Sequence, residues 1–154
     1  MSNCWLNGKT CVVTGASGGM GAGIAATLIK KHGCKVIGIA RSEPKMIKFI
    51  EELGPTYAEQ FSYKLFDVSK KENWDNFVEE LQADGVKVDI LVNNAGILPK
   101  FKRFDRYDMD EIERAININF YSCVYSIKAM LPMLLESPEG GIVNIDSSAA
   151  LMSL

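Results

Sequence analysis

Short apolar, β-branched runs alternate with helix-length amphipathic segments along this sequence. The spacing predicts strands at 10–14, 35–39, 61–66, 88–92 and 141–146, and helices at 20–32, 44–53, 70–83 and 110–135. Strands separated by helices pair in parallel, because each connection has to cross back over the sheet. The run Cys11, Val12, Val13 has no polar member, as expected where helices cover both faces of a sheet. The sequence therefore predicts an α/β fold with a doubly wound parallel sheet.

The composition is that of a folded soluble domain. The 154 residues are 47% apolar and 23% charged, and 17 Lys and Arg against 19 Asp and Glu leave a formal net charge of −2. This balance excludes a disordered chain, and without a block of like charges neither nucleic acid nor an anionic membrane is an expected partner. No apolar run is long enough to span a membrane, and residues 1–9 lack the pattern of a signal peptide. We therefore expect one cytoplasmic domain.

The cysteines and the single histidine form no catalytic or metal-binding pattern. Cys4, Cys11, Cys34 and Cys123 make no Cys-x-x-Cys pair, so reduced thiols are expected rather than a zinc site or a disulfide framework. His32 follows two lysines and precedes a glycine, which is typical of the basic last turn of a helix. A lone histidine also excludes a His-Glu-x-x-His metal site and argues against a Ser-His-Asp triad.

A glycine-rich segment follows the first expected strand and opens the first expected helix. Gly15, Gly19 and Gly21 let the chain turn sharply and let its backbone approach a ligand closely. A helix that begins there offers free N–H groups and the positive end of its dipole to a phosphate. The spacing is Gly-x-x-x-Gly-x-Gly rather than Gly-x-Gly-x-x-Gly, and the Gly-Lys-Ser/Thr of a P-loop is missing. The loop therefore predicts a dinucleotide site rather than a kinase or a GTPase.

Arg41 follows the second expected strand, at the place that meets the adenosine ribose in dinucleotide-binding folds. A carboxylate there accepts a hydrogen bond from the 2′-hydroxyl of NAD, whereas an arginine binds the 2′-phosphate of NADP. No acidic residue occupies the acceptor position in this sequence. The alternative is a surface arginine paired with Glu43. We favour NADP (NADPH) as the cofactor, with NAD the less expected one.

Four motifs occur in a fixed order: the loop 14–21, the pair Asp67 and Val68, the tetrad Asn-Asn-Ala-Gly at 93–96, and the segment 142–147 ending in Ser147. In this order they resemble the motifs of the short-chain dehydrogenase/reductase family of the single-domain type. The resemblance implies a Rossmann-like sheet of five strands in the order 3-2-1-4-5, with residues 1–154 as an incomplete dinucleotide-binding domain. It also implies an NADP-dependent oxidoreductase that transfers hydride between the nicotinamide and an alcohol or ketone carbon.

The same resemblance assigns the cofactor contacts. It places the pyrophosphate and its ribose on the glycine loop, the 2′-phosphate on Arg41, the adenine beside the pair at 67–68, and the inner ribose on the tetrad. The implied cofactor-binding residues are Gly15, Ser17, Gly19, Met20, Gly21, Arg41, Asp67, Val68, Asn93, Ala95 and Gly96.

Two polar residues are candidates for the chemistry. Ser147 ends the fifth expected strand, at the edge where parallel sheets bind ligands, and the resemblance makes it the serine that polarises the substrate carbonyl. Ser148 is the alternative, and either hydroxyl can instead cap a loop. Asn119 falls on the apolar stripe of helix 110–135, where a buried amide needs partners, so it belongs either to a structural network or to the site. The resemblance implies that Asn119 orders the water of a proton relay.

The family's chemistry uses a Tyr-x-x-x-Lys pair, and no tyrosine in the 154 residues is followed four positions later by a lysine. We therefore expect the N-terminal part of a longer product or the product of a truncated gene, with the C-terminal strands missing. The strand at 141–146 is then an open edge. Two functions remain: an NADP-dependent oxidoreductase in the parent protein, or a non-catalytic nucleotide-binding module. The expected partner is a small alcohol or carbonyl substrate, with a homo-oligomer at full length.

Overall fold

A computed structural model describes residues 5–147 of the chain. It contains five strands and the helices that connect them, with one 3-10 turn (η1) and one π-turn (η2). In chain order the elements are β1 (Thr10–Thr14), α1 (Gly19–His32), β2 (Lys35–Ala40), α2 (Glu43–Leu53), α3 (Pro55–Ala58), β3 (Phe61–Leu65), α4 (Lys71–Ala83), β4 (Ile90–Asn93), η1 (Phe104–Arg106), α5 (Met109–Ile116), η2 (Asn117–Tyr121), α6 (Ser122–Glu136) and β5 (Gly141–Asn144).

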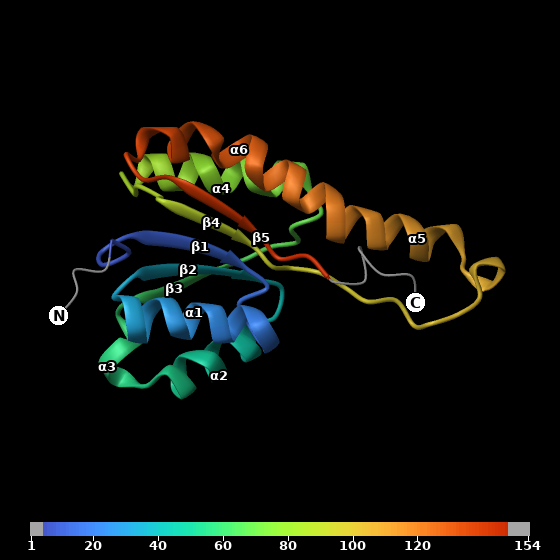
Figure 1. Cartoon of the computed structure of the whole chain (residues 1–154), viewed down its shortest axis with the longest axis horizontal. Coiled ribbons are helices and arrows are strands. Elements are labelled where there is room, and N and C mark those ends of the chain that lie inside the picture. The colour runs from blue at the N-terminus through green and yellow to red at the C-terminus, as the bar shows by residue number, and fades with distance from the viewer. Residues whose placement is uncertain (1–4, 148–154) are drawn as a thin grey trace.

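The five strands form one parallel sheet in the order β3-β2-β1-β4-β5, which confirms the predicted topology. Helices α1 and α2 cover one face, and α4 and α6 cover the other (Figure 1). Neighbouring residues of β1 pack into the hydrophobic cores on opposite faces of the sheet, because side chains alternate along a strand. Val13 packs with Ala25 and Ile29 of α1, whereas Val12 packs with Trp74 of α4 and Met130 of α6. Both faces of the sheet are therefore apolar, as the uninterrupted strand pattern predicted.

Helix α2 buries Leu53 and half-buries Ile50 as predicted, but it exposes Ile47. The sequence pattern predicts Ile47, Ile50 and Leu53 on the inner face, but Ile47 is 47% exposed. Besides Leu53, the structure buries Met46 and Phe49, which the pattern did not predict. Phe49 packs edge-on against Phe61 of β3, with ring centroids 4.9 Å apart. Burying Met46 and Phe49 is favourable because burial energy scales with the apolar area removed from water.

The helix predicted at 110–135 runs continuously from Met109 to Glu136, but a π-turn interrupts its regular winding. A π-turn inserts one extra residue into the hydrogen-bond ladder, and such turns are frequent at functional sites. Ile116, which the 3.6-residue period places on the buried stripe, is 46% exposed. Ile118 in the π-turn is buried instead. The regular period therefore predicted the extent of the helix and the burial of Met130 and Leu134 correctly, and the burial of Ile116 incorrectly.

By length and composition alone, this helix is long and apolar enough to cross a membrane, with a mean hydropathy of 1.2 over its most apolar 18 residues. Within the fold, 33% of that window is buried. Its α6 part packs on α4 and β4, and Figure 1 shows it lying along the sheet. The α6 part therefore belongs to the packed α/β fold, whereas α5 has no buried residue.

The cysteines and His32 lie in environments that indicate structural roles. Cys11 and Cys34 are buried, Cys123 is half-buried, and none of the three forms a disulfide within residues 5–147. Burial raises the pKa of Cys11, and the adjacent Cys34 thiol raises it further, so Cys11 stays protonated. Helix α1 ends at His32, and Gly33 closes it in the left-handed conformation. Cys4 lies outside the described residues, and between residues 5 and 147 no group of three or more potential metal ligands occurs.

Strand β5 is an exposed edge of the sheet. It pairs with β4 on one side only, and Ile142, Val143 and Ile145 are each more than a third exposed. No further strand follows it within residues 5–147. The described part of the chain therefore has the open apolar edge that the sequence predicts.

Asp89 joins three elements at the amino-terminal edge of the sheet. Its Oδ2 accepts the Thr10 main-chain N–H at 2.9 Å, its Oδ1 accepts the Ser137 hydroxyl at 2.6 Å, and the Lys9 ammonium lies 3.5 Å from Oδ1. Burial alone would raise the pKa of Asp89. The hydrogen bonds from Ser137 and Thr10 and the charge of Lys9 outweigh burial and hold the pKa below its ordinary value. The Asp89 carboxylate is therefore charged at neutral pH and holds β1, β4 and the end of α6 together.

Replacing this carboxylate is expected to remove part of the acid sensitivity of the fold. A lowered pKa in the folded state stabilises the protein above the ordinary carboxyl pKa of about 4, and this stabilisation is lost as the pH falls through the folded value. Asp89→Asn should lower the free energy of unfolding by about 1 kcal/mol at pH 7 and flatten its decline below about pH 4. Urea unfolding at a series of pH values measures both effects. Asp84→Asn, at an exposed turn, controls for the loss of one negative charge, and parallel curves for Asp89→Asn and the wild type would contradict the assignment.

Candidate cofactor-binding site

The loop between β1 and α1 has a backbone shape that only glycine fits at two positions. Gly15 has a φ of 69°, in the left-handed region. A Cβ atom at Gly21 would lie 2.2 Å from the carbonyl oxygen of Gly15 and 2.6 Å from Nδ2 of Asn94. Such contacts are shorter than any real Cβ tolerates, so the first turn of α1 touches the loop directly. The loop and the helix N-terminus are thereby held in the arrangement that receives a phosphate.

Thr14 ties the glycine loop to the end of β4. Its Oγ1 accepts the main-chain N–H groups of Asn94 and Ala95, both at 2.9 Å, and its carbonyl accepts Nδ2 of Asn94 at 2.9 Å. Thr14 is 2% exposed, so these bonds are shielded from water. Asn94 is a site residue that the sequence reasoning missed, although it stands inside the tetrad at 93–96. Besides the tetrad, a second signal was that Thr14 and Asn94 stand at the carboxyl ends of β1 and β4, which are neighbours in the sheet.

Removing the Thr14 hydroxyl is expected to destabilise the fold. Thr14→Val keeps the shape of the side chain but leaves two main-chain N–H groups without an acceptor, at a cost of about 1–3 kcal/mol for each group that stays buried. Thr14→Ser keeps the hydroxyl and should retain most of the stability. Urea unfolding of the two variants beside the wild type separates the hydroxyl from the lost methyl group. Equal stabilities for the valine and serine variants would refute this role.

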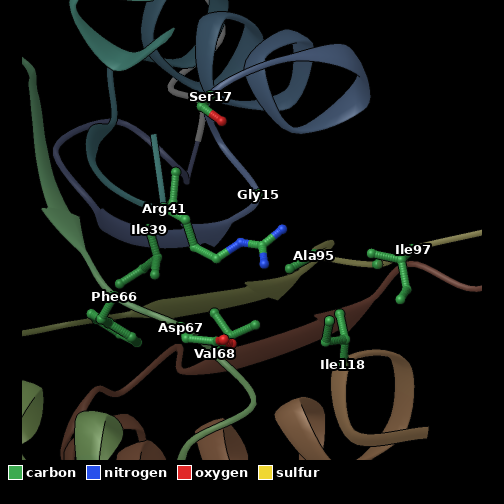
Figure 2. Close-up of a pocket in the computed structure, with 12 residues that line it drawn as sticks. Gly15, Ser17, Ile39, Arg41, Phe66, Asp67, Val68, Ala95, Ile97 and Ile118 are labelled. Atoms are coloured by element: carbon green, nitrogen blue, oxygen red, sulfur yellow. The ribbon is translucent and has the colours of Figure 1, made fainter. Parts of the chain in front are cut away.

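A cavity of about 140 Å³ opens at the carboxyl ends of the strands, beside the glycine loop (Figure 2). It brings together the predicted cofactor residues Gly15, Ser17, Arg41, Asp67, Val68, Ala95 and Gly96. Its other lining residues are mostly apolar and were not predicted: Ile39, Ala40, Phe66, Ile97 and Ile118. The first three were detectable as apolar strand ends, whereas Ile118 lies in the π-turn, which a regular helical period does not predict.

Four predicted cofactor residues do not line this cavity. Gly19 and Met20 lie exposed at the start of α1, and Gly21 packs behind the loop against Gly15. Asn93 is 4% exposed and faces the sheet interior, where its Nδ2 donates to Oδ1 of Asn144 at 2.9 Å.

The buried Asn93 amide also accepts the Ser126 hydroxyl at 2.8 Å. Its side chain therefore joins β4, β5 and α6 and does not line the cavity. The reason is the alternation of β4, which directs this side chain toward α6.

Arg41 and Asp67 set the charge of the cavity. Arg41 extends from the end of β2 over the cavity (Figure 2). Among the described residues it has no ion pair within 4 Å, and Glu43, the partner in the alternative interpretation, accepts a hydrogen bond from the Tyr63 hydroxyl at 3.2 Å. The guanidinium is therefore available to an anionic ligand.

Asp67 supplies the opposite charge on the facing wall. Its Oδ1 accepts the main-chain N–H of Ser69 at 3.0 Å and the Ser69 hydroxyl at 2.8 Å. Burial alone would raise the pKa of Asp67, but these two hydrogen bonds and the charges of Arg41 and Lys70 hold it below its ordinary value. The cavity thus combines a cation suited to a phosphate with a carboxylate suited to an amino group.

The two residues implied in chemistry lie farther along the same edge. Asn119 is exposed, so the prediction of a buried amide was wrong. Its amide nevertheless makes two hydrogen bonds, because Oδ1 accepts the Ile97 N–H at 2.8 Å and Nδ2 donates to the Ile97 carbonyl at 2.9 Å. Ser147 is exposed after β5, and its N–H donates to Oδ1 of Asp146 at 2.8 Å. Ser148 lies outside the described residues, so the choice between the two serines stays open.

The site fits a dinucleotide. The contact between Gly15 and Gly21 leaves a bare backbone cradle at a helix N-terminus. Oδ1 of Asn94 is buried beside the loop with no partner among the described residues. Arg41 and Asp67 stand where the adenosine end would lie. The fold and the site together define the class of Rossmann-like dinucleotide-binding proteins.

Within this class, the chain belongs to the short chain dehydrogenase family, whose family model matches residues 9–154. Benzil reductase ((S)-benzoin forming) of Saccharomyces cerevisiae is 33% identical over 150 residues, which are 94% of this chain and 56% of the yeast protein. The crystal structure of serine dehydrogenase from Escherichia coli has a TM-score of 0.82 at 30% identity, over 94% of this chain and 65% of that one.

A short chain dehydrogenase/reductase structure from S. cerevisiae has a TM-score of 0.79 at 30% identity, over 95% of this chain and 56% of that one. The predicted family and fold are thereby confirmed. The chain spans between about half and two thirds of the length of these three proteins.

Proposed function

We propose that the chain is the cofactor-binding part of an NADP-dependent oxidoreductase that transfers hydride between the nicotinamide and an alcohol or ketone carbon. The observation that carries the choice of NADP is Arg41. Its guanidinium extends over the glycine-loop cavity without an ion-pair partner among the described residues. A guanidinium binds a phosphate through two parallel hydrogen bonds, and this match favours the 2′-phosphate over a free 2′-hydroxyl.

Different residues at the carboxyl ends of the strands would bind different parts of the cofactor and the substrate. The glycine loop and the N-terminus of α1 would hold the pyrophosphate, and Asp67 would accept a hydrogen bond from the adenine amino group. Ala95 and Gly96 would line the inner ribose. When bound, the nicotinamide supplies or accepts the hydride. Ser147 would donate a hydrogen bond to the substrate oxygen, and Asn119 would stand beside the water of the proton relay.

A second candidate concerns residues 1–154 taken alone. None of their tyrosines has a lysine four positions later, so the acid/base pair of the family's chemistry is not encoded in them. A positioned acid/base contributes about 10²–10⁴-fold to rate, so this segment alone would bind nucleotide without measurable turnover. The small-molecule substrate, self-association and a cytoplasmic location are proposals for the protein that carries this segment.

Titration of the 154-residue chain with NADPH, followed by nicotinamide fluorescence, tests the proposal. We expect saturable binding of NADPH and weaker binding of NADH. A chain that binds neither cofactor overturns the proposed function. A chain that binds NADH as tightly as NADPH overturns the NADP assignment and leaves the dinucleotide site intact.

A further inference from the structure

A second opening adjoins the cofactor cavity. This groove of about 320 Å³ lies between the segment that leads from β3 into α4 and the helical run of α5 and η2. It shares Arg41, Asp67 and Ile118 with the cavity, so the two spaces meet at these residues. Figure 2 shows Arg41 and Asp67 on opposite sides of the cavity. We call the second opening the charged groove, because it is lined by Arg41, Asp67, Lys70, Asp110, Glu113 and Arg114.

The walls of the two spaces differ in polarity. Apart from Arg41 and Asp67, the cavity is lined mostly by apolar side chains and small residues, whereas the groove is lined mostly by ionisable ones. Flat rings such as adenine bind in largely apolar pockets with a few polar groups. A phosphate dianion is costly to place against apolar walls and needs cations beside it. By this criterion the base belongs in the cavity and the 2′-phosphate in the groove, with Arg41 at the junction.

Two cations of the groove besides Arg41 are available to an anion. Lys70 lies directly before α4, and Arg114 lies in α5. Within residues 5–147, no carboxylate oxygen lies within 4 Å of the charged end of either side chain. Lys71, the next residue along, pairs with Asp75 instead and does not line the groove. The groove therefore gathers three cations from β2, α4 and α5 that a phosphate can bind.

The carboxylates of the groove set a limit to its affinity for anions. Burial raises the pKa of Asp67, but the hydrogen bonds from Ser69 and the charges of Arg41 and Lys70 outweigh burial and lower it, so this carboxylate is charged. Asp110 lies in the first turn of α5, where the helix dipole favours a negative charge.

Glu113 provides a test of sign. It is exposed, and it has no ion pair among the residues that the structure describes. A phosphate in the groove is attracted by Lys70 and Arg114 and repelled by Glu113. Removing charges of opposite sign from one groove should therefore change phosphate affinity in opposite directions.

We propose that Lys70 and Arg114 are specificity-determining residues, which bind the 2′-phosphate of NADP in the charged groove together with Arg41. This inference rests on the proposed function and adds to it two residues that lie outside the β2 end. Arg41 supplies the planar contact with two hydrogen bonds, and the other two cations offset the remaining charge of the dianion. Lys70 and Arg114 are exposed, so water and salt screen their contributions, which are smaller than that of Arg41.

The first experiment measures the NADPH and NADH affinities of Lys70→Ala, Arg114→Ala and Glu113→Gln by nicotinamide fluorescence at low salt. NADPH affinity should fall about threefold in each cation variant and about tenfold in the double variant, and it should rise about twofold in Glu113→Gln. NADH affinity should stay unchanged, because NADH carries no phosphate for the groove. Lys71→Ala is the matched control and should change neither affinity.

A second measurement uses cofactor fragments without the nicotinamide. The compounds 2′,5′-ADP and 5′-AMP share the adenosine and the 5′-phosphate, and they differ only by the 2′-phosphate. Calorimetric titration of the wild-type chain should show a preference for 2′,5′-ADP that decreases as salt is added. The preference should be smaller in Lys70→Ala and Arg114→Ala and unchanged in Lys71→Ala.

The outcomes separate this inference from the proposed function. Equal losses of NADPH and NADH affinity in the cation variants overturn the specificity role, and so does a wild-type ratio of the two affinities in the double variant. A Glu113→Gln chain that binds NADPH more weakly than the wild type also overturns it. If the wild-type chain binds neither cofactor, the proposed function fails and this inference fails with it. If the wild type prefers NADPH and none of the groove variants changes that preference, only the role of the groove fails.

Discussion

Gly21→Ala is expected to lower NADPH affinity at least tenfold and to destabilise the fold, whereas Gly23→Ala in the same helix should do neither. The added Cβ at Gly21 would lie 2.2 Å from a main-chain oxygen of the glycine loop, so the backbone has to move. Overpacking of this kind costs about 1–3 kcal/mol. At Gly23 nothing lies within 4 Å of the added atom, and alanine is the better helix former by about 0.5–1 kcal/mol.

The pair of variants makes this a matched test. Urea unfolding gives the stabilities of the two variants, and NADPH titration gives their affinities. Each variant adds one methyl group, and the two positions are two residues apart in α1. The expected order of stability is Gly23→Ala above wild type above Gly21→Ala. If Gly21→Ala binds NADPH like the wild type, the close contact between α1 and the loop does not shape the phosphate site.

Arg41→Ala is expected to reverse the cofactor preference. A hydrogen-bonded pair with a charged group contributes about 1.5–3 kcal/mol, so NADPH affinity should fall about 10–150-fold. NADH affinity should stay within about twofold, because the 2′-hydroxyl makes no use of the guanidinium. Arg41→Lys keeps the charge but loses the planar fork, and an intermediate affinity is expected.

Two control variants separate this effect from a general change of charge. Arg106→Ala removes an exposed arginine away from the cavity and should leave both affinities unchanged. Glu43→Gln tests the surface-pair alternative, in which Arg41 is restrained by its neighbour. Parallel titrations with NADPH and NADH at one ionic strength give the ratio directly. An Arg41→Ala chain that still prefers NADPH would show that another group selects the phosphate.

Local patterns were sufficient for the order of the elements and for the glycine loop. Apolar runs such as the one at 11–13 can only be covered on both faces, and strands spaced by helices can only pair in parallel. The glycine loop could also be predicted from the local sequence. Gly15 and Gly21 are required by backbone contacts only a few residues apart, so the requirement is visible in the local sequence.

The directions in which individual side chains point could not be predicted from local sequence patterns. Asn93 and Asn94 are adjacent and identical, yet one joins β4 to β5 and α6 while the other supports the glycine loop. The choice depends on which strand and which helix each one faces after the sheet has formed. The inner face of α2 depends likewise on Phe61 of a neighbouring strand, which the helix pattern does not contain.

From residue order alone follow the parallel α/β sheet, the position of its phosphate loop and the candidate cation Arg41, because each depends on short-range geometry. The tertiary structure decided the burial of Ile118 in the π-turn and the two hydrogen bonds between Asn119 and Ile97. The hydrogen bonds join residues 22 positions apart, and bonds between such distant groups form only when packing brings their elements together.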